Sequence, residues 1–296
     1  MIKRGLSRYF SSLQQSDHLS GNAYMFVNDF GKSIAPIGGK RLNQKNFSYN
    51  IIGNNKDKGI DLLKSLARHK NGRTDTELCC DVINHLASTL FYFGDYHYLY
   101  TKIDDEYKLV SLEQRGLFKV LNFFVQLVPK AERNKFKSVA LFDTSKNIIR
   151  FRVSDNKIQT MVYKFMLKLL AKTSDVTPKF FLENPMNNDA NFNVANYTRI
   201  KSIFISILTY KYSWPQRSLD TEHITEYYLV HRHMKYCAKK AQIRVFILEQ
   251  LNSMFTKLEV DAKIVEQGLP VESEIIQSLG EMQRGEISIN TFTDWS

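Results

Sequence analysis

Apolar side chains spaced three and four residues apart predict helices along most of the chain after residue 58. Each segment places these side chains on one helix face, and glycines at positions 72, 94 and 285 follow the ends of three of them. The predicted helices span about 59–71, 74–92, 112–126, 157–172, 194–210 and 224–257, with a last helix over 270–285.

Shorter segments rich in β-branched and aromatic residues predict strands. Residues 96–103 and 107–112 flank two aspartates and predict one β-hairpin, and residues 138–142 and 148–153 predict a second. Further short strands are expected at 24–27 and 262–265. The remaining stretches of 20–58, and residues 173–195 with Pro178 and Pro185, predict irregular structure and a loop.

The segment 224–257 is the longest of the predicted helices. Its apolar positions repeat at close to 3.5 residues, and 34 residues of helix extend about 50 Å. Such a rod is longer than one small core, so we expect a spine that packs against several neighbours. The predicted fold class is therefore mainly α with small β-hairpins, an α+β fold built on one long spine helix.

Charge indicates the class of partner. The chain has 41 Lys and Arg against 30 Asp and Glu, a formal net charge of +11. A surplus of this size favours nucleic acid or another anionic surface, because lysines that neutralise phosphates release counterions. The alternative is a charged surface that keeps the protein soluble. The 43% of hydrophobic residues excludes low hydrophobicity as a reason for disorder.

Cysteines and apolar runs exclude several other classes. The three cysteines, Cys79, Cys80 and Cys237, are too few for a disulfide scaffold and form no C-x-x-C zinc pair, which favours a reducing compartment. No apolar run reaches the ~20 residues that cross a bilayer, so no membrane is expected as a partner. The basic residues 1–12 are interpreted as an N-terminal arm, with an organellar transit peptide as the alternative.

Two basic clusters are candidates for contact with a polyanion. On the helix 157–172, Lys164, Lys168 and Lys172 follow one another at four-residue spacing. Lys157 lies seven residues before Lys164, two helical turns earlier. Like charges at this spacing repel, so an anion alongside would explain them, although a solvated helix face is the alternative. The second cluster, on the long helix, consists of Arg232, Lys235, Lys239 and Lys240.

Catalytic signatures are scarce. The chain lacks a phosphate-binding loop, a dinucleotide fingerprint and the common hydrolase motifs, and His231 and His233 point to different helix faces. We therefore predict no enzyme activity, no metal and no cofactor. One alternative stays open: Asp95, followed by Glu106 and Lys108 on an adjoining strand, resembles the Mg²⁺-binding core of the PD-(D/E)XK nucleases. An exposed charged hairpin would explain the same residues.

The C-terminal region carries the most specific pattern. It reads ITEYYLVHRHMKYCAKKAQIRVFILEQLNSMF and then VDAKIVEQGLPVESEIIQSLGEMQRGEISINTF. A long helix that ends in a Leu-Asn pair, a short strand, a proline followed by acids and a closing Gly-Glu-Ile-Ser resemble the end of tailed-bacteriophage portal proteins. The likeness covers residues 224–292, and the order of the preceding elements is compatible with the same family.

The portal resemblance implies a division of the whole chain. Residues 1–110 would form a wing-like region, and 111–175 two stem helices (112–136 and 157–172) joined by a clip hairpin at 138–153. Residues 176–223 would hold the tunnel loop and a connecting helix, and 224–296 the long helix and a crown-like end. Lys157, Lys164, Lys168, Lys172, Arg232, Lys235 and Lys239 would then be candidates to border a DNA channel.

The same resemblance implies a function without catalysis. Portal subunits form a homo-oligomeric ring, here expected to be a dodecamer, through which double-stranded DNA is packaged and ejected. The expected partners are DNA, a packaging motor, the capsid and tail adaptor proteins, and the expected location is the capsid vertex of a virion made in the host cytoplasm. A helical nucleic-acid-binding protein without enzyme activity is the remaining alternative.

Overall fold

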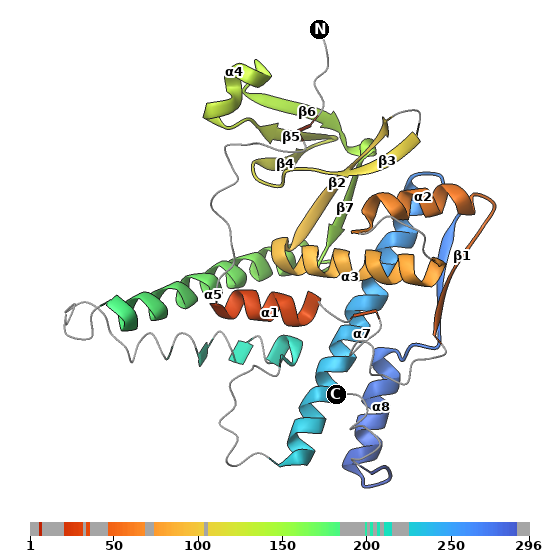
Figure 1. Cartoon of the computed structure of the whole chain (residues 1–296), viewed down its shortest axis with the longest axis vertical. Helices are drawn as coiled ribbons and strands as arrows, with labels where there is room; N and C mark the ends of the chain where they lie inside the picture. Colours follow the sequence, from red (N-terminus) through yellow and green to blue (C-terminus); the bar gives the residue numbers. More distant parts are fainter. Residues whose placement is uncertain are drawn as a thin grey trace.

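The structure is a computed structural model that describes residues 6–7, 21–31, 34–35, 47–68, 74–103, 106–183, 199, 202–203, 206–207, 210–214 and 225–288. Over these residues the chain is a mixed α+β fold with small antiparallel sheets and one long helix, α7 (Glu226–Lys257). Figure 1 shows α7 running beside α8 (Glu272–Gln283) and crossing α3 (Asp75–Phe93). The predicted fold class is confirmed at this level.

Local signals in the sequence place α3 accurately. The Thr74 hydroxyl accepts a hydrogen bond from the Glu77 N–H at 3.2 Å, and the Glu77 carboxylate accepts one from the Thr74 N–H at 3.3 Å. This reciprocal pair satisfies two donors that the first helical turn leaves without partners. Gly94 ends the helix at a φ of +80°, which glycine adopts without strain. The helix predicted at 74–92 is confirmed. A helix also exists near the predicted 59–71, but α2 (Lys56–Leu66) begins and ends earlier than predicted.

The strand predicted at 24–27 is wrong, since these residues belong to helix α1 (Gly21–Gly31). Ala23, Phe26, Val27 and Phe30 follow helical spacing and are buried together. Phe30 lies with its ring 5.1 Å from Phe91 of α3 and 4.8 Å from Tyr236 of α7. This aromatic cluster therefore joins three helices, and a short apolar run alone did not distinguish helix from strand.

The first predicted hairpin is confirmed. Strands β2 (Asp95–Ile103) and β3 (Glu106–Ser111) pair antiparallel, and β7 (Ile148–Arg152) pairs with the other edge of β2. The second predicted hairpin is wrong although both of its strands exist. Strand β6 (Ala140–Thr144) pairs with β5 instead of β7, so residues 138–153 form no clip hairpin.

The helix predicted at 112–126 is also wrong, and with it the stem helix at 112–136. These residues form β4 (Leu117–Val120) and β5 (Phe123–Leu127), followed by a turn of 3-10 helix (Lys130–Glu132) and the short α4 (Arg133–Phe136). Together with β6 they make a sheet in the order β4-β5-β6. The run from Leu117 to Val125 is apolar on both sides of a two-residue turn, and sheet pairing decided its conformation.

Helix α5 (Lys157–Glu183) begins as predicted but continues beyond residue 172, through Pro178. The loop predicted at 173–195 is therefore helical up to Glu183, and its remainder lies outside the described residues. A proline inside a helix removes one hydrogen bond and crowds the preceding turn, so Pro178 is an unfavourable residue that α5 nevertheless includes. The described residues of 199–212 are helical, in agreement with the helix predicted at 194–210.

The C-terminal region follows the prediction closely. Strand β8 (Lys263–Gln267) comes after α7, as expected at 262–265, and pairs antiparallel with β1 (Ser48–Ile52), more than 200 residues earlier in the chain. Helix α8 occupies the predicted span and packs along α7 through Ile275, Leu279 and Met282. The spine helix α7 thus packs against α8, and the strand that follows α7 pairs with a strand from the N-terminal part of the chain.

A buried ion pair anchors the spine. Arg244 of α7 is completely buried, and its guanidinium donates two hydrogen bonds of 2.8 Å to the two carboxylate oxygens of Glu266 in β8. A third bond of 2.8 Å goes to the carbonyl oxygen of Pro270, just before α8. The Tyr49 hydroxyl of β1 donates to the same carboxylate at 2.7 Å. One carboxylate therefore holds α7, β1 and β8 together.

We predict that Glu266→Gln lowers the free energy of unfolding by roughly 3–5 kcal/mol, because a buried guanidinium loses its charge partner. Urea denaturation followed by circular dichroism measures this loss. The control is Glu286→Gln, which breaks an exposed ion pair with Arg284. An exposed pair contributes little, so the control should keep the wild-type midpoint, and equal midpoints for both variants would contradict the anchoring role.

Candidate nucleic-acid interface

The lysines of α5 have different environments. Lys157 and Lys168 are exposed and lie on the same helix face, since 11 residues span three turns. Lys164 lies between them but is half-buried, and its ammonium donates to the Asp95 carboxylate. Lys172 belongs to the same helix, and its side chain lies outside the described part. Lys157 and Lys168 therefore remain as the described surface lysines of this predicted stripe.

Asp95 explains the position of Lys164. This carboxylate is buried at the start of β2 and accepts hydrogen bonds from Lys164 and from Arg150 of β7, the latter with its Nε at 3.1 Å. Burial alone raises the pKa of Asp95, but the bonds and charges of Lys164 and Arg150 outweigh it and hold the pKa below its ordinary value. The charge of Lys164 is thus used inside the protein to fasten α5 to the sheet.

The apolar spacing that predicts this helix, at Ile158, Met161, Val162, Phe165 and Leu169, does not mark its buried face. Residues Ile158, Met161, Val162 and Phe165 have ideal spacing for a core face, yet all four are exposed. The core is instead contacted by Tyr163, Met166, Leu167 and Leu170. At 100° per residue, the exposed apolar side chains lie beside Lys157 and Lys168 rather than opposite them. We call Ile158, Met161, Val162 and Phe165 the helix stripe.

The second predicted basic cluster, on α7, is largely occupied within the protein. Arg232 donates to the Trp214 carbonyl oxygen at 3.1 Å and stacks over Tyr228. Lys240 is 6% exposed and lies over the ring of Tyr236, and burial lowers its pKa to about 8. Lys235 is exposed. A single lysine of this cluster is thus fully at the surface.

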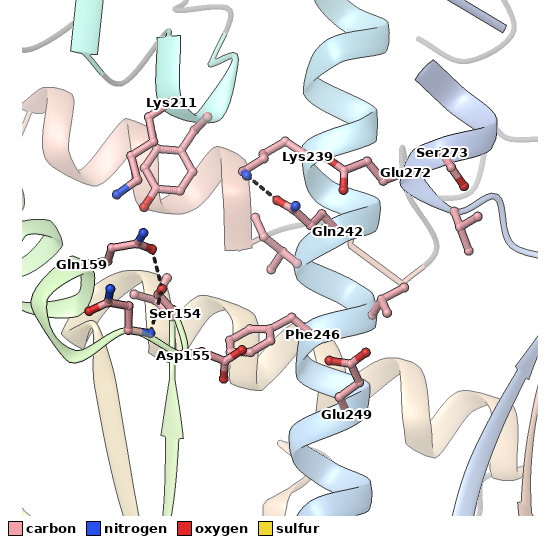
Figure 2. A pocket seen from close by; sticks show the side chains of 16 residues that line it. Ser154, Asp155, Gln159, Lys211, Lys239, Gln242, Phe246, Glu249, Glu272 and Ser273 are labelled. Atoms are coloured by element: carbon pink, nitrogen blue, oxygen red, sulfur yellow. Dashed lines mark hydrogen bonds between the residues drawn. The ribbon is translucent and has the colours of Figure 1, made fainter. Parts of the chain in front are cut away.

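Lys239 lines a cavity of about 720 Å³ between the start of α5, the middle of α7 and the start of α8. Figure 2 shows Lys211 and Lys239 on one side of it, with Gln159 below Lys211 and Lys239 bonded to Gln242. Burial and the nearby Lys239 charge lower the pKa of Lys211, so an anionic group would relieve the two ammonium groups. The cavity also has three acids, Asp155, Glu249 and Glu272, which repel an extended phosphate chain.

The nuclease constellation is not assembled. Asp95 pairs with Arg152 at one end of β2, whereas Glu106 pairs with Ile103 at the other end. Eight residues of strand separate the two carboxylates by roughly 26 Å. Glu106 and Lys108 form an exposed ion pair of 2.6 Å. Metal ligation by these three residues would need them within a few ångströms, so the structure does not support a shared Mg²⁺ site.

No other group of ligands replaces it within the described residues, where no cluster of three or more His, Cys, Asp or Glu could hold a metal ion. His231 and His233 point apart as predicted: His231 lies 3.1 Å from Gln283, and the Nε2 of His233 lies 3.3 Å from the Cys237 sulfur. Burial raises the pKa of the Cys79 and Cys237 thiols. These thiols stay protonated near neutral pH.

Comparison with known proteins adds no assignment. No model of a known protein family matches the chain, and no curated protein sequence matches it. Within the described residues, no helix combines the length and apolar character that a bilayer crossing requires.

Sequence reasoning missed the partners of its own candidates. Lys164 and Asp95 are 69 residues apart, and nothing in their local patterns connects them. Lys211 lies in a helical segment whose pattern carries no basic cluster, so no signal singled it out. The exposure of the helix stripe had no signal either, because spacing shows which side chains share a face but not which face is covered.

We predict that Lys164→Met affects mainly the stability of the fold and Lys168→Met mainly the affinity for DNA. The first removes one partner of a buried carboxylate and should lower the free energy of unfolding by about 1–2 kcal/mol. The second removes an exposed charge and should leave stability unchanged while weakening binding to a DNA duplex. Denaturant titration and fluorescence anisotropy measure the two effects, and the reverse assignment would contradict the placement of Lys164.

Stability should also fall in mild acid because of His97. This imidazole is buried in β2, with Nδ1 2.7 Å from the Gln114 side-chain oxygen, and burial lowers its pKa to about 4. The unfolded chain binds the proton near pH 6.5, so stability is complete above that pH and is lost as the pH falls toward 4. From pH 6.5 to 5 the loss is about 2 kcal/mol. His97→Phe should flatten this dependence, and an unchanged pH slope would exclude His97 as the cause.

Proposed function

We propose that this chain is a non-enzymatic subunit of a homo-oligomeric ring that conducts double-stranded DNA, as the portal of a tailed bacteriophage does. The observation that carries the proposal is the surface of α5, where an apolar stripe lies beside the exposed Lys157 and Lys168. Apolar side chains gathered on a surface favour a protein partner, and lysines favour a phosphate chain. One helix thus offers both contacts that a DNA-conducting ring needs.

The C-terminal elements support the same family. The order of a long helix (α7), a short strand (β8) and an acid-led helix (α8) corresponds to the pattern that resembles portal proteins. The assignment of the central region has to change, since neither a helix at 112–136 nor a clip hairpin exists. In the revised proposal, α5 is the helix that borders the channel, and the sheet β4-β5-β6 belongs to contacts between subunits.

The physics of translocation agrees with lysines as channel residues. DNA that slides must be held weakly and without sequence preference, which contacts to phosphates provide and contacts to bases do not. A ring needs two different complementary faces on every subunit. Energy would come from a separate packaging motor, and the capsid and tail adaptors would bind the two ends of the ring at the capsid vertex.

A helical nucleic-acid-binding protein without a ring is the second candidate, because the net charge of +11 favours it equally. It gives no reason for large apolar side chains at the surface of α5. Assembly distinguishes the two. Sedimentation velocity at micromolar concentration should show a ring of about a dozen subunits, and a strictly monomeric chain would exclude the portal function.

We predict that Lys157→Glu combined with Lys168→Glu lowers affinity for a DNA duplex about tenfold or more at low salt. Two lost phosphate contacts should also reduce the salt dependence by about 2 in the slope of log K against log salt. Fluorescence anisotropy across a salt series measures both quantities.

The control carries the same charge change elsewhere: Lys130→Glu combined with Lys263→Glu, two exposed lysines outside α5. The control should keep the wild-type affinity to within a few-fold. An equal loss in both double variants would reduce the effect to net charge, and wild-type affinity independent of salt would contradict phosphate contact altogether.

A further inference from the structure

The sheet β4-β5-β6 exposes large apolar side chains on one face, around Val125, which is buried at its centre. In its register Phe118 lies opposite Val125 and Val125 opposite Phe142, while Val120 lies opposite Phe123. Residues opposite each other point to the same side of a sheet, so these side chains form one continuous face. The other face, with Phe124, Gln126 and Leu141, is buried against the protein. We call the exposed side chains the sheet patch: Phe118, Val120, Leu121, Phe123, Leu127 and Phe142.

Leu121 extends this patch to the hairpin tip. It is 87% exposed and has a φ of +52°, in the left-handed region where a tight hairpin turn normally has Asn or Gly. The chain thus places a large apolar side chain at a position where both backbone conformation and solvent disfavour it. Neither local structure nor the core of this subunit explains the leucine.

The sheet patch is larger than the largest apolar patch of an ordinary monomer, and the helix stripe lies in the upper part of the range for such patches. Their exposed side chains present roughly 700 and roughly 500 Å² of apolar area, whereas the largest patch of a typical monomer is about 300–600 Å². A standard interface covers about 800 Å² on each partner. Both surfaces remain exposed in one copy of the chain, so neither covers the other.

We propose that the helix stripe of one copy docks on the sheet patch of the next copy. A helix that packs on a sheet face is a standard way to bury both apolar surfaces. One contact of this kind, repeated around a ring, covers the two surfaces of every copy, whereas pairing of two sheet patches would leave each helix stripe in solvent. The contact deepens the proposed ring function and rests on it.

The position of the lysines fits this contact. Lys157 and Lys168 lie beside the helix stripe, so docking buries the apolar side chains and leaves both ammonium groups at the border of the interface. Ring symmetry would repeat this pair once for each subunit. A circle of lysines is the arrangement that a sliding phosphate chain requires.

The test uses one substitution in each surface of the full-length chain. Phe165→Glu changes the helix stripe, and Phe142→Glu changes the sheet patch. Both side chains are largely exposed, at 63% and 59%, so both variants should keep the wild-type unfolding midpoint. Sedimentation velocity should show each variant as a monomer, because every copy has lost one of the two surfaces that continue the ring.

Mixing the two variants gives the decisive result. The intact helix stripe of the Phe142→Glu chain should dock on the intact sheet patch of the Phe165→Glu chain, and assembly should stop at a one-to-one dimer. Ile276→Glu, a substitution of a partly exposed apolar residue on α8, serves as the control and should assemble like the wild type.

Several outcomes overturn the contact. A mixture that remains monomeric shows that the two surfaces do not recognise each other, and a Phe165→Glu chain that still dimerises shows that sheet patches pair with themselves. A monomeric wild type that binds vesicles of anionic phospholipid through Phe165 assigns the helix stripe to lipid.

Two outcomes separate the contact from the proposed function. If Phe142→Glu and Phe165→Glu chains still form the ring that the wild type forms, the contact is wrong but the ring stands. If the contact behaves as expected and the assembly fails to bind a DNA duplex, the proposed function falls while the contact stands.

Discussion

The carboxylate of Glu266 is the point on which the C-terminal half of the fold depends. A guanidinium as deeply buried as that of Arg244 is costly unless its charge and its donors are matched. Glu266 matches the charge, and Glu266 with the Pro270 carbonyl accepts from Nε and Nη2, whereas Nη1 is buried without a hydrogen-bond partner among the described residues. Because Tyr49 donates to the same carboxylate, β1 is held against β8, and α7 against both. The aromatic cluster that contains Phe30 and Phe91 packs against the spine helix α7, which these contacts hold in place.

Outside the core built on α7, one copy of the chain leaves large apolar side chains exposed. Helix α5 buries one face through Tyr163 and Leu167 and exposes the helix stripe on another. The sheet β4-β5-β6 likewise buries one face and exposes the apolar side chains of the sheet patch on the other. In the proposed function, this surplus apolar area serves assembly and the lysines beside it serve a polyanion. Within the described residues, no group of three or more His, Cys, Asp or Glu could hold a metal ion.

Prediction succeeded where local interactions decide the structure. The capping box at Thr74 and the glycine at residue 94 define α3, and long apolar periodicity defines α5 and α7. It failed at residues 117–127, where a short apolar run fits either period, and at β6 and β7, which exist as predicted but pair with other strands. Strand pairing is a long-range contact, so local pattern predicts a strand without predicting its neighbour.

The sequence by itself determined the charge, the amphipathic helices and the order of elements from the spine helix onward, because these depend on composition and on spacing of a few residues. The tertiary structure decided which apolar face of α5 is buried, that Lys164 pairs with Asp95, and that Asp95 and Glu106 lie at opposite ends of the β2-β3 hairpin. The physical reason is that burial and pairing are properties of two distant segments together. The spacing of residues along one segment does not show which distant segment it packs against.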